Sequence, residues 1–152
     1  MADHLRTQIR DAAKTLVTGL VTTGANAFAG RPESRPLQES ELPGLLVYTN
    51  EEESEFASGQ RPTRRQVRNC QLLVHGFAQA TADLDKTLDT IAKEVEAALE
   101  ADPTLGALAK DLYLTNTAKE SDPEAKQPTG EIVLTFTCEY HTREGIPDAA
   151  LA

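Results

Sequence analysis

Residues 131–142, EIVLTFTCEYHT, carry the clearest strand pattern in the chain. Apolar and more polar side chains alternate through this stretch with a period of two. Such a period is typical of a β-strand, because successive side chains point to opposite faces of a sheet. We therefore predict a strand over residues 131–142 with its apolar line on the core. The apolar line is Ile132, Leu134, Phe136, Cys138 and Tyr140, and the other is Val133, Thr135, Thr137, Glu139 and His141.

Two stretches upstream extend this strand into a sheet. Residues 111–119 also alternate, and a polar loop over residues 120–130 separates them from the closing strand, which predicts a hairpin. Residues 65–80 predict a longer strand in which both side-chain lines are partly apolar. Such a strand suits the centre of a sheet, or one whose second face is covered by a partner. The two lines are Cys70, Leu72 and Val74 against Val67, Leu73 and Phe77.

Two amphipathic helices are predicted from apolar residues that recur every three to four positions. The first spans residues 3–19, with Asp3 as its N-cap. The second begins at Thr81 or Asp83 and runs to about residue 101. The apolar stripes are Leu5, Ile9, Ala12, Ala13, Leu16 and Leu20 in the first helix, and Leu84, Leu88, Ile91, Val95 and Leu99 in the second.

Shorter elements fill the interval between the helices. We expect a short extended piece over residues 27–30, a polar loop over residues 31–43 and a strand over residues 45–50. The order of elements predicts a single α+β domain over residues 1–152, with a mostly antiparallel sheet and the two amphipathic helices packed on it. The tail from about residue 145 is expected to be mobile.

Composition narrows the class of protein. The 152 residues are 39% hydrophobic and 26% charged, which is ordinary for a soluble globular chain. The net charge of -9 argues against a general nucleic-acid binder, since neutralising phosphates requires an excess of Lys and Arg, but it permits a wall past which DNA slides. No apolar run is long enough for a membrane span, and the N-terminus predicts an amphipathic helix rather than a signal peptide.

A reversal of charge lies between the strand at residues 45–50 and the strand at residues 65–80. We interpret this segment as a long loop that docks on other copies of the chain, acid to base, around a ring. A solvated hairpin loop whose charges partly neutralise one another is the alternative. The acidic block is Glu51, Glu52, Glu53 and Glu55, and the arginine block is Arg61, Arg64, Arg65 and Arg68.

The sequence predicts no catalytic constellation. Cys70, His75, Cys138 and His141 are candidate metal ligands, but the Cys and His of each strand point to opposite faces, which argues against one tetrahedral site. A Cys70–Cys138 disulfide requires adjacent strands, whereas a chain without an export signal favours reduced thiols in a cytoplasm. Neither a phosphate-binding glycine loop nor a nucleophile elbow is present. We therefore predict no enzyme activity, no catalytic or metal-binding residue and no cofactor.

Four segments follow one another in a combination that points to a family. After the first helix come TTGANAFAGR at residues 22–31 and LPGLLVYT at residues 42–49, the latter leading into the acidic block. DLD at residues 83–85 lies in the second helix, and EIVLTF at residues 131–136 lies in the closing strand. Together they resemble the tail terminator proteins of long-tailed bacteriophages, also called tail completion or minor tail protein U-like proteins. The resemblance covers about residues 5–142.

The resemblance implies an α+β fold and a ring of six copies. Such a ring would cap the tail tube protein, end tube polymerisation and receive head-tail connector proteins, with DNA passing through its lumen without specific binding. The implied location is the head-proximal end of the virion tail, after assembly in the host cytoplasm. From the charge blocks we expect an inter-subunit or partner interface made by Glu51, Glu52, Glu53, Glu55, Arg61, Arg64, Arg65, Arg68 and Arg31.

Other functions are compatible with the same sequence. A head-tail connector or neck protein would bind the head rather than the tube. A small cytoplasmic α+β enzyme subunit or ligand-binding domain would require a pocket with convergent polar groups, which the sequence does not locate. A monomeric adaptor would use the apolar second face of the strand at residues 65–80 as its partner site.

Overall fold

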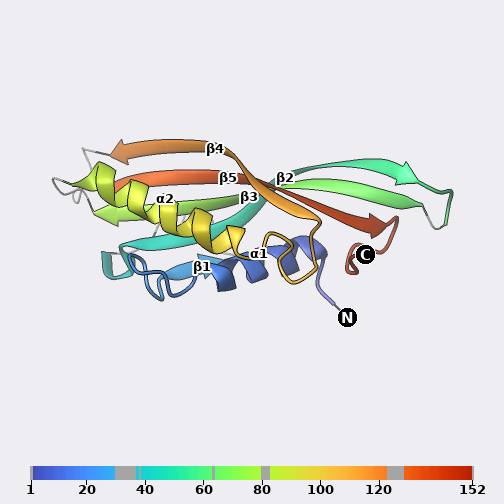
Figure 1. Ribbon diagram of the computed structural model, residues 1–152, viewed down its shortest axis with the longest axis horizontal. Helices are drawn as coiled ribbons and strands as arrows, with labels where there is room; N and C mark the ends of the chain where they lie inside the picture. Colours follow the sequence, from blue (N-terminus) through green and yellow to red (C-terminus); the bar gives the residue numbers. More distant parts are fainter. Residues whose placement is uncertain are drawn as a thin grey trace.

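The computed structural model describes residues 2–29, 37, 39–62, 64–79, 83–122 and 129–151. Figure 1 shows an elongated molecule whose longest strands follow its long axis. The predicted α+β class is confirmed. The elements are α1 (Leu5–Leu16), β1 (Ala27–Ala29), the 3-10 helix η1 (Glu39–Glu41), β2 (Gly44–Ser58), β3 (Arg65–Gln79), α2 (Leu84–Glu100), β4 (Asp111–Asp122) and β5 (Thr129–Arg143).

The described strands form one sheet in the order β1-β2-β3-β5-β4. β1 pairs with β2 in parallel, and the other neighbours are antiparallel, so the prediction of a mostly antiparallel sheet is confirmed. β3 lies in the middle, as its two partly apolar side-chain lines predict. The register of β3 and β5 is unbroken from the Arg65–Arg143 pair to the Gln79–Thr129 pair. The pairing between β3 and β5 is therefore uninterrupted along both strands.

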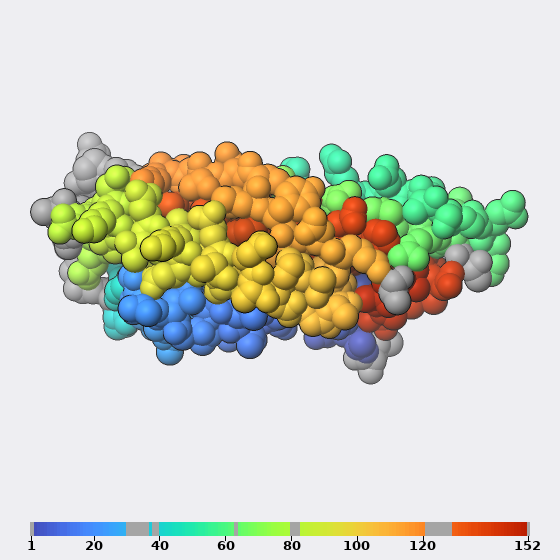
Figure 2. Space-filling model, viewed as in Figure 1, coloured from blue at the N-terminus to red at the C-terminus, as the bar shows by residue number. Residues whose placement is uncertain are grey.

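Both helices pack on the same face of the sheet, and the core lies between them and the strands. In β5, buried and half-buried residues alternate, and the apolar line that the sequence predicts is the buried one. α2 contacts β3 and β5, while α1 contacts β1 and β2. Gly76 allows α2 to approach closely, because a Cβ there would lie 2.8 Å from Cγ2 of Ile91. Figure 2 shows α1, α2 and β4 side by side on this side of the molecule. We call the opposite face of the sheet the open face.

The acidic block lies in a strand, and the prediction of a loop at this point is wrong. β2 continues to Ser58 and stays paired with β3 as far as the Ser58–Arg65 pair, with a bulge between Thr49 and Glu52. β3 and β5 remain paired beside this stretch, so β2 gains backbone hydrogen bonds that outweigh its like charges and its weak strand propensity. The turn begins at Gly59, whose φ of 88° suits glycine.

The helix boundaries agree with the predictions to within a few residues. His4 rather than Asp3 caps α1, since its Nδ1 accepts a hydrogen bond from the backbone N–H of Arg6 at 3.1 Å. An imidazole nitrogen can serve in this way because it satisfies one of the free N–H groups of the first turn. Asp83 occupies the N-cap position of α2, without a hydrogen bond from its side chain, and Thr81 lies outside the described residues.

Two predicted loops differ from their expected bounds or are only partly described. The final hairpin is longer than predicted, because β4 continues to Asp122 and β5 begins at Thr129. Pairing between these two strands persists to the Asp122–Thr129 pair, which shortens the loop expected over residues 120–130. Most of the loop expected over residues 31–43 lies outside the described residues, and η1 falls within it.

The C-terminal tail runs back along the body of the molecule. The N–H of Leu5 at the start of α1 donates a hydrogen bond to the carbonyl of Pro147 at 2.8 Å. The N–H of Leu151 donates to the carbonyl of His141 in β5 at 3.0 Å. These contacts place the tail between α1 and β5, and its expected mobility stays a prediction.

Candidate functional site

The distal half of the β2–β3 hairpin projects beyond both helices, and we call it the arm (residues 51–62 and 64–69). Figure 1 shows the arm at the end of the molecule opposite the start of α2, with the end of β5 beside it. The arm contains both charge blocks that the sequence singles out. Because side chains alternate along a strand, the arm presents one row of residues toward the helix side and another on the open face.

Glu52 lies at the base of the arm on the helix side, and its side chain is only 7% exposed. The carboxylate accepts hydrogen bonds from Nη1 of Arg6 at 3.1 Å, from Nη1 of Arg68 at 3.4 Å and from the Tyr140 hydroxyl. Burial first, and then the hydrogen bond to Glu52, raises the pKa of Tyr140. Burial, followed by the charge of Arg6, lowers the pKa of the neighbouring His4. The network ties the start of α1 to the three central strands, so Glu52 faces into the molecule.

The other arginines of the block also have partners within the chain. Nε and Nη2 of Arg64 each lie 2.9 Å from a carboxylate oxygen of Glu144, and Arg61 reaches the same carboxylate at 3.2 Å. Arg65 donates through Nε to Nδ1 of His141 at 3.0 Å. The hydrogen bond from Arg64 lowers the pKa of Glu144, whereas burial and then the charge of Arg65 lower the pKa of His141. Arg61 is the outermost of the four, with its side chain 75% exposed.

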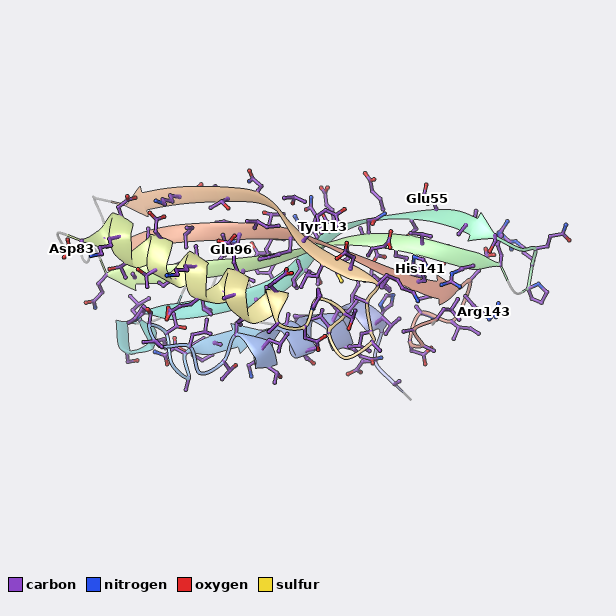
Figure 3. The ribbon with its side chains drawn as sticks, viewed as in Figure 1. Glu55, Asp83, Glu96, Tyr113, His141 and Arg143 are labelled. Atoms are coloured by element: carbon purple, nitrogen blue, oxygen red, sulfur yellow. The ribbon has the colours of Figure 1, made fainter. Side chains whose placement is uncertain are left out.

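Glu51, Glu53 and Glu55 form the acidic row of the arm on the open face, and all are exposed. Figure 3 labels Glu55 in this row. Within the described part of the chain, none of these carboxylates has an ion-pair partner. Glu51 and Glu53 border a polar hollow of about 350 Å³, which the exposed Tyr113 also lines. The remaining lining residues are Asn69, Gln71 and Thr137. Arg31, the last predicted interface residue, lies outside the described residues.

The two cysteines face each other across adjacent strands but are not bonded. Cys70 in β3 is the register partner of Cys138 in β5, and both thiols are free and buried. His75 belongs to the other side-chain line of β3, where its ring hydrogen-bonds Tyr48 and Glu131. Over the described ranges, no group of three or more His, Cys, Asp and Glu side chains is arranged to hold a metal ion. The arrangement of these residues suits core packing.

The buried thiols predict a loss of stability at alkaline pH. Burial raises the pKa of Cys70 and of Cys138 to about 12 from an ordinary value of 9.0, so both thiols stay neutral in the folded chain when the unfolded chain ionises. The contribution of the two thiols to the free energy of unfolding is therefore fully present below about pH 9. It falls as pH rises toward 12, by about 1.4 kcal/mol per pH unit for each thiol. Urea unfolding at pH 8 and pH 10 measures this slope. Cys138→Ala should reduce it, and an unchanged slope in that variant would contradict the assignment.

No sequence motif marks the residues that hold the arm in place. Arg6 and Tyr140 lie within ordinary helix and strand patterns, and Glu144 follows the last predicted strand without any motif. Phe56 also lies outside the strand expected over residues 45–50, although an aromatic residue directly after an acidic block is a usable signal of a strand that continues. Arg6, Tyr140 and Glu144 meet their partners only through the fold, because those partners lie 46 or more residues away along the chain.

The geometry supports contacts between proteins: a projecting strand pair, fixed by internal ion pairs, with exposed charge and an exposed aromatic residue. No helix in the described part of the chain has the length and apolar character needed to cross a membrane.

Comparison with protein families finds a match over residues 4–140. The chain is a structural protein of a bacteriophage tail and therefore a component of the virion. It belongs to the family described as phage minor tail protein U, which confirms the predicted resemblance. A solved chain from the virion of a native gene transfer agent (GTA) particle is similar, with 15% identity, a TM-score of 0.41, and coverage of 91% of this chain and 92% of that one. No curated protein matches the sequence.

Proposed function

We propose that six copies of this chain form a ring that caps the phage tail tube, ends its polymerisation and presents a joining surface to head-tail connector proteins. The observation that carries the proposal is the match to the phage minor tail protein U family over residues 4–140. The arm adds support, since a fixed projection suits a contact in which one surface of a subunit meets a different surface of its neighbour. The proposed role is structural and requires neither catalysis nor a cofactor.

The candidate interface residues divide into two groups with different proposed roles. Those with partners in the same chain position the arm, and those that face outward contact neighbouring copies or partner virion proteins. The positioning group is Glu52, Arg64, Arg65 and Arg68. The outward-facing group is Glu51, Glu53 and Glu55, together with Arg61, whose side chain is 75% exposed although it also pairs with Glu144. Arg31 remains a proposed member of the interface.

DNA would pass through the lumen of this ring without specific binding. The net charge of -9 repels phosphate groups, which keeps the duplex from adhering to the wall. At physiological salt this repulsion acts over about 8 Å, the screening length, and so only close to the wall. The ring would be assembled in the host cytoplasm and lie at the head-proximal end of the tail.

The solution mass of the purified chain tests the proposed ring. Light scattering at low and moderate salt should give a mass near six times 16.5 kDa, or a shift toward it as concentration rises. A chain that stays monomeric at all concentrations, and also on added tail tubes, would contradict the ring. Binding to heads but not to tubes would favour the head-tail connector or neck function instead.

Reversing the charge of the acidic row is expected to weaken the association between copies of the chain. Replacing Glu51, Glu53 and Glu55 together by Lys should weaken ring formation about tenfold, because exposed ion pairs each contribute about 0.2–1 kcal/mol. The dissociation constant from sedimentation or light scattering gives the effect, with Glu96→Lys on the exposed side of α2 as the matched control. Equal dissociation constants for the triple variant and the control would show that the acidic row is not part of the interface.

A further inference from the structure

The tip of the arm presents apolar side chains beside fixed arginines. Phe56 is 54% exposed, and Ile146, just beyond β5, is 47% exposed. The guanidinium of Arg64 lies 3.6 Å from the centre of the Phe56 ring while its nitrogens bind Glu144. A ring held in this way loses little conformational freedom on docking, and aromatic and arginine side chains are enriched among the residues that dominate interface energies. Arg61 adds an exposed positive charge at the same tip.

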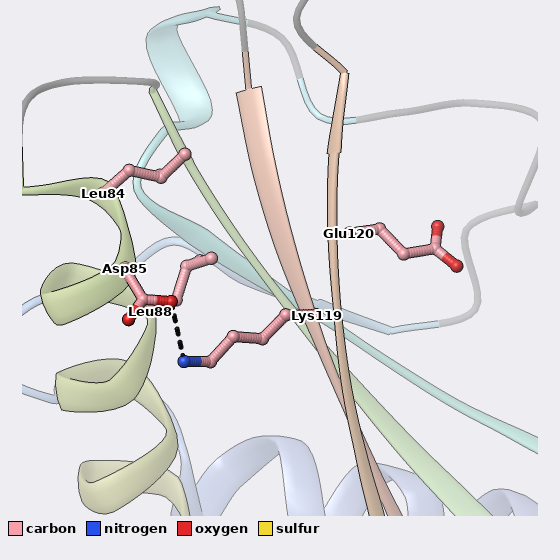
Figure 4. Close-up of a pocket in the computed structure, with 5 residues that line it drawn as sticks. All are labelled: Leu84, Asp85, Leu88, Lys119 and Glu120. Carbon is pink, nitrogen blue, oxygen red and sulfur yellow. Dashed lines mark hydrogen bonds and ion pairs between the residues drawn. The ribbon is translucent and has the colours of Figure 1, made fainter.

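A groove lies between the first turns of α2 and the end of β4 (Figure 4). Its volume is about 290 Å³, and its apolar lining is Leu84 and Leu88. Lys119 extends from β4 to the carboxylate of Asp85, with its Nζ 2.8 Å from Oδ1. Lys119 Nζ also lies 2.7 Å from Oδ1 of Asp89, so two carboxylates flank a single ammonium group beside the apolar floor. The Glu120 side chain points away from α2 (Figure 4).

We infer that the tip of one copy's arm docks in the α2–β4 groove of the next copy. Phe56 then packs against Leu84 and Leu88, and Arg61 lies beside the carboxylate of Asp85. The inference rests on the proposed ring and names the contact that holds it together. Burying a phenyl ring against leucine removes apolar surface from water, which supplies the favourable free energy of the contact.

A second copy fits the groove because the two surfaces are complementary in chemistry and in position. An apolar ring edged by positive charge meets an apolar floor edged by negative charge. The tip and the groove lie toward opposite ends of the long axis (Figure 1). Each copy therefore uses its tip on one neighbour and its groove on the other, which is the heterologous contact from which closed rings are built.

Two variants, each lacking one of the two surfaces, test the docking. The tip variant carries Phe56→Ser and Arg61→Gln, and the groove variant carries Asp85→Arg and Asp89→Arg. All four positions are exposed, so both variants should retain the wild-type circular dichroism spectrum. Each should associate at least thirtyfold more weakly than the wild-type chain, since losing an interface hot spot has an effect of that size. Val21→Ser, at an exposed apolar residue outside both surfaces, is the control and should assemble normally.

Mixing the two variants gives the sharpest result. The intact groove of one meets the intact tip of the other, so at high concentration the mixture should form a dimer of twice 16.5 kDa and nothing larger. Ring formation by either variant alone, or a mixture that stays monomeric, overturns the docking while the wild-type ring stands. Failure of the wild-type chain to form any ring instead overturns the proposed function on which the docking rests.

Discussion

Replacing Glu52 by alanine is expected to destabilise the protein by about 3–5 kcal/mol, because it leaves buried positive charge without its counter-ion. The Glu52 side chain is 7% exposed, and that of Arg68 is 13% exposed. Arg6 and the Tyr140 hydroxyl lose their acceptor in the same substitution. These lost interactions lie at the base of the arm, where α1 meets β2, β3 and β5.

Urea unfolding compares the Glu52→Ala variant with Glu53→Ala, which removes the same chemical group from the exposed neighbour. Glu53→Ala should change stability by less than about 0.5 kcal/mol, as exposed substitutions do. Glu52→Gln should lie between the two, because an amide oxygen can still accept hydrogen bonds but carries no charge. Equal stability of the Glu52 and Glu53 variants would show that Glu52 belongs to an outward-facing interface, as the charge blocks alone predict.

Replacing Ile91 by alanine is expected to cost about 2–5 kcal/mol of stability, since it opens a cavity between α2 and the sheet. Ile91 is 1% exposed and lies over Gly76, the position in β3 where a side chain would collide with it. The glycine and the isoleucine therefore act together to set the distance between helix and sheet. Ile132 in β5 forms the other side of the same contact.

Denaturant unfolding of a graded series of variants tests this packing. Ile91→Val removes one methylene group and should cost about 0.5–1.5 kcal/mol. Lys93→Ala, two residues along the same helix but exposed, should change stability by less than about 0.5 kcal/mol. A loss of similar size at residues 91 and 93 would mean that α2 does not pack on the sheet through this side.

Strand periodicity predicted the centre of the fold because β3 and β5 are paired on both sides. Their side chains alternate without interruption, and in β5 the buried line is the one that the sequence indicates. The outer part of β2 was mistaken for a loop because four glutamates between residues 51 and 55 conceal the alternation. Its strand conformation comes from the neighbouring β3, a tertiary effect that local propensity does not contain.

The charge blocks were visible in the sequence, but their partners were not. Arg68 binds Glu52 within the same hairpin, whereas Arg64 binds Glu144, which lies 80 residues away along the chain. Pairs at such separations exist only once β5 lies beside β3. The blocks therefore mark the projecting arm, and the fold determines which of its charges face outward. Their place in an interface stays a prediction.

Capping of growing tail tubes tests the central claim most directly. Purified tail tube protein from the same phage is polymerised with and without the chain, and tube lengths are measured by electron microscopy. The proposed function predicts that elongation stops, with the chain bound at one end of each tube and six copies per tube. Tubes that lengthen at the same rate, with the chain absent from their ends, would contradict it.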